Sequence, residues 1–135
     1  MARRALGQGV PLTSISTDMT RFGRTDIVFS LTEIMSRYLA LGFSVAEVIS
    51  RSTSRPAAAA GIADRAGRIE VGRPADVSVL ELRDGDWTVF DAVGEELRLR
   101  RAFIPALTLL DGEPIEPGPG PHPWGWEPMR TADTR

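Results

Sequence analysis

The feature that most limits how this chain can fold is a pair of amphipathic helix patterns that follow only one strand pattern. Both helices open with Ser-x-x-Glu, at residues 30–33 and 44–47, which matches the capping box: the serine hydroxyl and the glutamate carboxylate bond each other's free backbone N–H groups. The first helix is expected to end at Gly42 and the second to run over residues 45–54. One strand is not a sheet and cannot cover the apolar faces of two helices. This half of the chain therefore needs a partner, or the chain is a fragment.

The strand pattern occupies residues 11–18, a short run of β-branched and small residues that ends on an acid. It predicts a short buried strand with Asp18 at its carboxyl end. The ten residues at the N-terminus predict the last turn or two of a helix, closed by Gly7 or Gly9. After the strand comes a loop that carries Arg21, Arg24 and Asp26.

From Gly61 onward the hydrophobic period changes from helical to two, which indicates strands. Before that point, four alanines at 57–60 predict a helical turn whose small side chains permit close approach of a neighbouring backbone. The expected strands are residues 77–84, ended by an Asp-Gly turn at 84–85, then 87–91, 97–103 and 104–110, ended by a second Asp-Gly turn at 111–112. From Glu116 the composition is rich in Pro and Gly, which is typical of an extended tail.

Composition removes several kinds of chemistry. The chain has no cysteine, which excludes disulfides and thiolate sites, and no lysine, which excludes a Schiff base, a P-loop or a carboxylated-lysine metal bridge from this chain. All sixteen basic residues are arginines, yet the net charge is −2, so we expect no nucleic-acid partner. No apolar run approaches the roughly 18–20 residues that cross a bilayer, and no signal-peptide pattern is present. We therefore expect a cytoplasmic protein with no membrane partner.

Three stretches form a recognisable set. The first is Ser-Ile-Ser-Thr-Asp at residues 14–18 with the helix patterns at 31–42 and 45–49. The second is Arg-Pro-Ala-Ala-Ala-Ala-Gly-Ile at residues 55–62, and the third is Gly-Arg-Ile-Glu-Val-Gly-Arg-Pro-Ala-Asp, which begins at residue 67. Together they resemble the metal-dependent amidohydrolase superfamily, most closely its deacetylase and dihydroorotase-like branch. The last two stretches are similar to that family's Asn-Pro-Ala-x-x-x-Gly motif and to its return into a β-sandwich.

The resemblance implies an α/β fold: the last strand and helices of a (β/α)8 TIM-type barrel over residues 1–62, strands of a small β-sandwich over 63–115, and the tail over 116–135. It also implies a hydrolase that cleaves the C–N bond of a small-molecule amide or cyclic amide with a metal-activated water. Asp18 corresponds to the family's aspartate on the eighth strand, which binds the metal and accepts a proton from the water. Zinc is the metal that the resemblance favours, and Arg21 and Arg24 are weaker candidates for binding a substrate carboxylate.

The family's histidine ligands have no counterpart in this sequence, because the only histidine is His122, in the tail between two prolines. One carboxylate cannot hold zinc, which takes about four ligands. We therefore expect the isolated chain to bind no metal and to be inactive, and its uncovered apolar faces to favour self-association or a complementary barrel chain. Two alternatives stay open for this chain: it is one half of a split enzyme, or it is a non-catalytic β-rich interaction or assembly module.

Several of these residues also have plainer interpretations. An acid at the end of a strand is commonly a turn or helix-cap residue, and Asp18 has that alternative role. Arg98 and Arg100 share one strand face, which is either an anion patch or a solvated surface. Trp124 and Trp126 form either a stacking platform or a packing contact of the tail.

Overall fold

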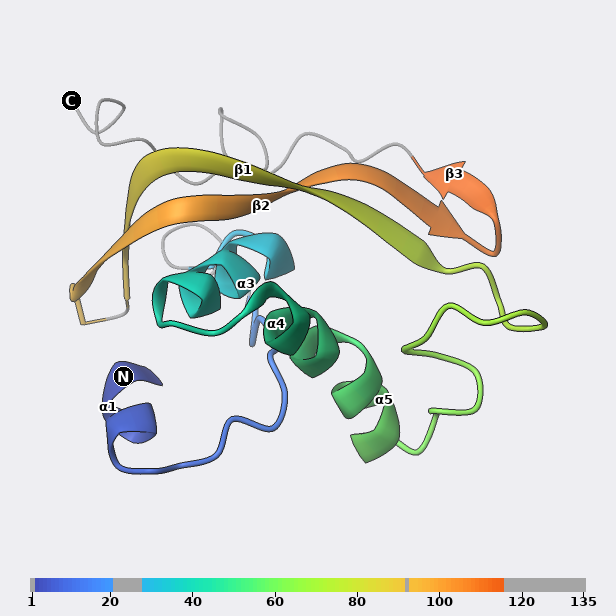
Figure 1. The fold of residues 1–135 in the computed structure, drawn as a ribbon, viewed down its shortest axis with the longest axis horizontal. Coiled ribbons are helices and arrows are strands. Elements are labelled where there is room, and N and C mark those ends of the chain that lie inside the picture. The colour runs from blue at the N-terminus through green and yellow to red at the C-terminus, as the bar shows by residue number, and fades with distance from the viewer. Residues whose placement is uncertain (1, 21–27, 92, 116–135) are drawn as a thin grey trace.

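The computed structural model of the chain describes residues 2–20, 28–91 and 93–115. Its elements in chain order are α1 (Ala2–Gly7), α3 (Leu31–Ala40), α4 (Val45–Ser52), α5 (Ser54–Ala59), β1 (Val77–Phe90), β2 (Glu96–Leu110) and β3 (Glu113–Ile115). The strands form one antiparallel sheet in the order β1-β2-β3. Figure 1 shows the long curved hairpin of β1 and β2 arching over α3, with α4 and α5 leading away below it. No helix in the described ranges is long and apolar enough to span a membrane.

Strand β1 is longer than the sequence pattern predicts. It runs on through the Asp-Gly pair at 84–85, so the turn predicted there is wrong. Residues on both sides of that pair bond the same strand, β2, and the change of register is absorbed as a bulge between Asp84 and Trp87. Gly85 suits this bulge because a Cβ at that position would overlap the indole ring of Trp87.

Strand β2 is likewise one strand where two were predicted, at 97–103 and 104–110. Pro105 lies at a second irregularity, opposite the register shift between Val79 and Leu80, where a missing N–H disturbs the ladder least. The second Asp-Gly turn is confirmed: both of its residues have positive φ, 51° and 85°, and β3 returns antiparallel from it. The described strands form one sheet, whereas a sandwich requires two packed sheets.

Residues 11–18 do not form the predicted strand in the described structure. A strand needs a neighbouring strand to bond, and here the N–H of Ile15 donates to the Arg51 carbonyl of α4 (2.8 Å). The Ile15 side chain is buried all the same, so a helix fixes the segment in place of a sheet. The helix end predicted before this segment is confirmed, because α1 ends at Gly7 and Gly9 follows with a φ of 77°.

Both predicted helix starts are confirmed, one of them with the full capping box. In α4, the Ser44 hydroxyl accepts the Glu47 N–H (3.2 Å) and the Glu47 carboxylate accepts the Ser44 N–H (2.9 Å). In α3, the Ser30 hydroxyl accepts the Glu33 N–H (3.0 Å), but the Glu33 carboxylate accepts the N–H of Phe29 (3.3 Å). Half of the predicted box therefore forms at α3, with the carboxylate displaced by one residue.

Two clusters of buried side chains make up the core. One lies within the hairpin and consists of Trp87, Val89, Leu99, Ala102 and Ile104. The other joins residues 11–18, α3, α4 and β2, and consists of Ile15, Met35, Val48 and Phe103. Since Phe103 belongs to β2 and enters the helical cluster, the sheet covers part of the helix faces that the sequence pattern left without a partner.

A buried hydroxyl fixes α3 against β2. Ser36 is fully buried, accepts the N–H of Phe103 (2.9 Å) and donates to the Thr32 carbonyl (2.6 Å). Strand β3 pairs only with residues 108–110 of β2, so it does not extend as far as Phe103, whose N–H is bonded by Ser36 instead of by a strand. The serine side chain provides the acceptor that a further strand would otherwise supply.

The loop after α5 packs closely on the junction of α4 and α5. A Cβ at Gly67 would lie 2.8 Å from the Cβ of Ala57 and 2.9 Å from the Thr53 carbonyl oxygen. The Gly67 backbone also has a φ of 84°, in the left-handed region. The close backbone approach that the alanine run predicts is therefore observed.

Replacing Ser36 with alanine is expected to lower the free energy of unfolding by about 1–3 kcal/mol, because the Phe103 N–H would stay buried without an acceptor. Urea denaturation measures this loss. Ser52→Ala is the matched control, since the Ser52 hydroxyl donates to the Val48 carbonyl one turn back (2.9 Å) and its removal should change the unfolding free energy by less than about 0.5 kcal/mol. Equal losses in the two variants would contradict the role given to Ser36.

Gly67→Ala combines backbone strain with steric overlap. We expect it to lower the free energy of unfolding by about 1–2 kcal/mol for the left-handed backbone and by about 1–3 kcal/mol more for the overlap with Ala57 and Thr53. Gly72 has a similar φ of 88° with no atom within 4 Å of its Cβ position, so Gly72→Ala should show the backbone cost alone. The same melting shift in both variants would mean that the packing at Gly67 is loose.

Candidate active site

Asp18, the predicted catalytic residue, lies exposed at the end of residues 11–18. Its φ of 46° falls in the left-handed region, where aspartate is one of the few tolerated residues besides glycine. On either side of Asp18, Thr17 and Met19 are bonded to each other, because Thr17 Oγ1 accepts the Met19 N–H (3.3 Å). The backbone at Asp18 is therefore left-handed, and one short hydrogen-bonded contact spans it.

Two hydrogen bonds to α4 hold the residues that precede Asp18. Besides the bond from the Ile15 N–H to the Arg51 carbonyl, Arg51 Nε donates to the Leu12 carbonyl (2.9 Å). The Ile15 side chain is 4% exposed and lies in the cluster that contains Val48. Asp18 is thus the exposed end of a segment whose earlier residues, Leu12 and Ile15, are packed in the core and bonded to α4.

The described residues do not form a metal site on their own. Across residues 2–20, 28–91 and 93–115, no group of three or more Asp, Glu, His or Cys side chains could hold an ion. A carboxylate oxygen such as that of Asp18 suits a divalent cation as one ligand, but a catalytic zinc site takes about three protein ligands. Asp18 therefore fits such a site only as one member of a larger set.

Of the other residues that the sequence singles out, two are described. Arg98 Nε donates to Asp86 Oδ1 (2.5 Å), and Arg100 Nη1 lies 3.4 Å from Asp86 Oδ2. The hydrogen bond from Arg98 lowers the pKa of the Asp86 carboxyl. These exposed ion pairs favour the solvated surface over an anion patch. The roles of the remaining residues stay predictions, because the following lie outside the described part of the chain: Arg21, Arg24, Asp26, His122, Trp124 and Trp126.

Helix α3 carries a buried ion pair that was not predicted from the sequence. The Glu33 side chain is 4% exposed, and its Oε1 accepts from Nη2 and Nε of Arg37 (2.6 and 3.1 Å). Burial raises the pKa of Glu33, and the Arg37 charge opposes that rise. Arg37 Nη1 also donates to the Phe90 carbonyl (2.9 Å), so the pair ties α3 to the end of β1. The i,i+4 spacing of an acid and an arginine was the available signal, although such spacing is typical of exposed pairs.

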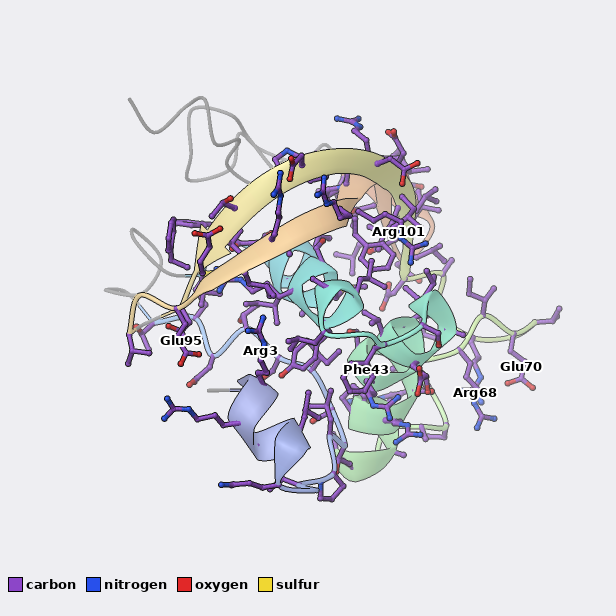
Figure 2. All side chains as sticks on the ribbon, turned by 60° about the vertical axis from the view of Figure 1, so that its left-hand side comes forward. Arg3, Phe43, Arg68, Glu70, Glu95 and Arg101 are labelled. Atoms are coloured by element: carbon purple, nitrogen blue, oxygen red, sulfur yellow. The ribbon has the colours of Figure 1, made fainter. Side chains whose placement is uncertain are left out.

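A pocket of about 240 Å³ lies next to this pair, between α1, α3 and the connection from β1 to β2. Its walls include Ser16, Arg37 and Tyr38, together with Arg3 of α1 and Glu95 near the start of β2. Figure 2 shows Arg3 and Glu95 on this side of the molecule, below the end of the hairpin. Asp18 does not line the pocket, so the pocket and the candidate catalytic carboxylate are separate features.

Comparison with known proteins gives a consistent relationship. The model of the amidohydrolase family matches residues 1–113. A deacetylase of Agrobacterium fabrum is 31% identical over 115 residues, which cover 85% of this chain and 28% of that protein. An imidazolonepropionase of Thermoplasma acidophilum is 35% identical over 88 residues, which cover 63% of this chain and 20% of that protein.

Two solved structures are similar in fold. An adenine deaminase matches with a TM-score of 0.78 at 26% identity, over 85% of this chain and 31% of that one. A dihydroorotase matches with a TM-score of 0.74 at 32% identity, over 84% of this chain and 30% of that one. The chain thus spans less than a third of the length of these relatives. The similarity to deacetylases and dihydroorotases that the sequence motifs indicated is confirmed, and the chain belongs to the amidohydrolase family.

Proposed function

We propose that this sequence forms part of a hydrolase that cleaves the C–N bond of a small-molecule amide or cyclic amide, with Asp18 as its catalytic carboxylate. Membership of the amidohydrolase family supports the reaction class. The observation that carries the role of Asp18 is its geometry: an exposed aspartate with a left-handed backbone, at the end of a segment bonded to α4. The family resemblance gives a catalytic aspartate at the same place in the motif.

In this proposal the Asp18 carboxylate accepts a proton from the water that attacks the carbonyl carbon of the amide. A C–O bond forms, the C–N bond breaks, and the proton passes to the departing nitrogen, which leaves a carboxylic acid and an amine. An exposed position favours this role, because the carboxylate must reach both the water and the substrate.

The family resemblance implies a divalent metal ion, with zinc favoured, which would polarise the reacting groups. Asp18 is proposed as one of its ligands. The other ligands would come from other segments of a longer chain or from a complementary chain, since the described residues offer no cluster of their own.

We further propose residues 1–62 as the end of a (β/α)8 barrel and 63–115 as strands of a small β-sandwich. The match to a deaminase and a dihydroorotase supports an α/β enzyme fold of this kind. In the complete barrel, neighbouring strands would bond residues 11–18 and convert them to the eighth strand. Arg21 and Arg24 follow Asp18 closely and are proposed to bind a carboxylate group of the substrate.

Asp18→Asn keeps the size of the side chain and removes the proton acceptor. In the active enzyme that contains this sequence, as one chain or with a complementary one, we expect turnover to fall by about 10²–10⁴-fold with little change in KM. Release of acetate from N-acetylated amino acids and ring opening of dihydroorotate are suitable assays, run first on the unmodified enzyme.

Asp64→Asn is the matched control, since Asp64 is also an exposed aspartate in a loop. It should leave turnover unchanged. If Asp18 is a turn or cap residue, Asp18→Asn would instead lose about 0.5–2 kcal/mol of stability while keeping its rate. An active but destabilised Asp18→Asn enzyme would therefore end the catalytic assignment.

A further inference from the structure

We propose that Arg51 is a positioning residue for Asp18, acting from helix α4 through both its backbone and its side chain. Arg51 bonds the chain at Leu12 and at Ile15, six and three residues before Asp18. The inference rests on the proposed function, because the role given to Arg51 is to fix the position of the catalytic carboxylate of Asp18.

The backbone contact arises from the way α4 ends. The last four carbonyls of a helix have no donor within the helix, and α4 ends at Ser52. Thr53, with φ −130° and ψ −84°, interrupts the helical path before Arg55, whose N–H would bond the Arg51 carbonyl in a continuous helix. The Arg51 carbonyl is therefore available at the helix end, where it accepts the Ile15 N–H at 2.8 Å.

The side chain of Arg51 is oriented from three directions. Its Nε donates to the Leu12 carbonyl (2.9 Å), its guanidinium carbon lies 5.0 Å from the centre of the Phe43 ring, and its Nη1 lies 3.7 Å from Glu47 Oε1. Phe43 lies at the start of α4, between that helix and α3 (Figure 2). Glu47 is itself held by the capping box with Ser44. The Arg51 side chain is 13% exposed, so this geometry is well shielded from competing water.

These contacts define where Asp18 can lie. Leu12 and Ile15 are fixed to one helix, and the buried Ile15 side chain packs in the core next to Val48. Only Ser16 and Thr17 lie between the Ile15 anchor and Asp18, which leaves little chain to absorb a displacement. A misplacement of about 1 Å at a reacting group can cost roughly 10²-fold in rate, so loosening this anchor should be visible in catalysis.

The first test concerns the 135-residue chain itself and needs no substrate. Amide hydrogen exchange is measured at Ile15 and its neighbours and, for comparison, at Leu99 of β2. Arg51→Gln should speed exchange around Ile15 by at least about 10-fold and leave Leu99 unchanged, because one of two anchors is lost while the sheet is untouched. Arg55→Gln, an exposed arginine on α5, is the control and should change neither. Equal acceleration at both places, or none at Ile15, overturns the proposal.

The second test measures turnover in the active enzyme that contains this sequence, with the N-acetylated amino acid or dihydroorotate as the probe. Arg51→Gln should lower kcat by about 10–100-fold with KM nearly constant, and Arg51→Lys, which keeps a charged donor, should recover part of that loss. If Arg51→Gln speeds exchange at Ile15 but does not lower kcat, while Asp18→Asn is inactive, the positioning role is overturned and the proposed function stays intact. A fully active Asp18→Asn enzyme overturns both.

Discussion

The hydrogen bond between the Ser36 hydroxyl and the Phe103 N–H is the contact on which the packing of helices against the sheet depends. The backbone donors and acceptors inside a helix are already used, so a helix cannot continue a sheet through its main chain. One buried serine overcomes this by presenting a side-chain oxygen to the open side of β2. With the strand held there, Phe103 packs in the cluster of Met35 and Val48, and part of the apolar faces of the two helices is covered. The Arg37 bond to the Phe90 carbonyl fixes the same helix to the end of β1.

The junction of α4 and α5 connects the two sides of the molecule. On one side its broken helical path leaves the Arg51 carbonyl to receive Ile15. On the other side Thr53 and Ala57 form the surface against which Gly67 packs, at the start of the chain's return into the sheet. The break in the helix at Thr53 therefore does more than end α4, because it leaves the Arg51 carbonyl for Ile15 and lies against Gly67.

The sequence predicted best what is decided locally. The starts of α3 and α4 follow from serine and glutamate three residues apart, and the turn at 111–112 follows from an Asp-Gly pair. The turn predicted at the other Asp-Gly pair, at 84–85, is wrong because the conformation there depends on the neighbouring strand. Both flanking segments bond β2, so a bulge forms in place of a turn. The predicted strand at 11–18 failed for a related reason, since a β-pattern without a neighbouring strand has nothing to pair with.

For the candidate site, too, local features could be predicted from the sequence and tertiary features could not. The position of Asp18 in a motif was readable from the sequence, whereas its left-handed backbone and its anchor on Arg51 are tertiary properties that no local pattern encodes. The family relationship and the lone carboxylate together explain why such an anchor matters. A metal-dependent site assembled from several segments tolerates errors of only about 0.5 Å between its members. The proposed role of Asp18 would therefore require its own chain to hold it firmly, and the two bonds from α4 fix the residues before it where the described residues offer no flanking strand.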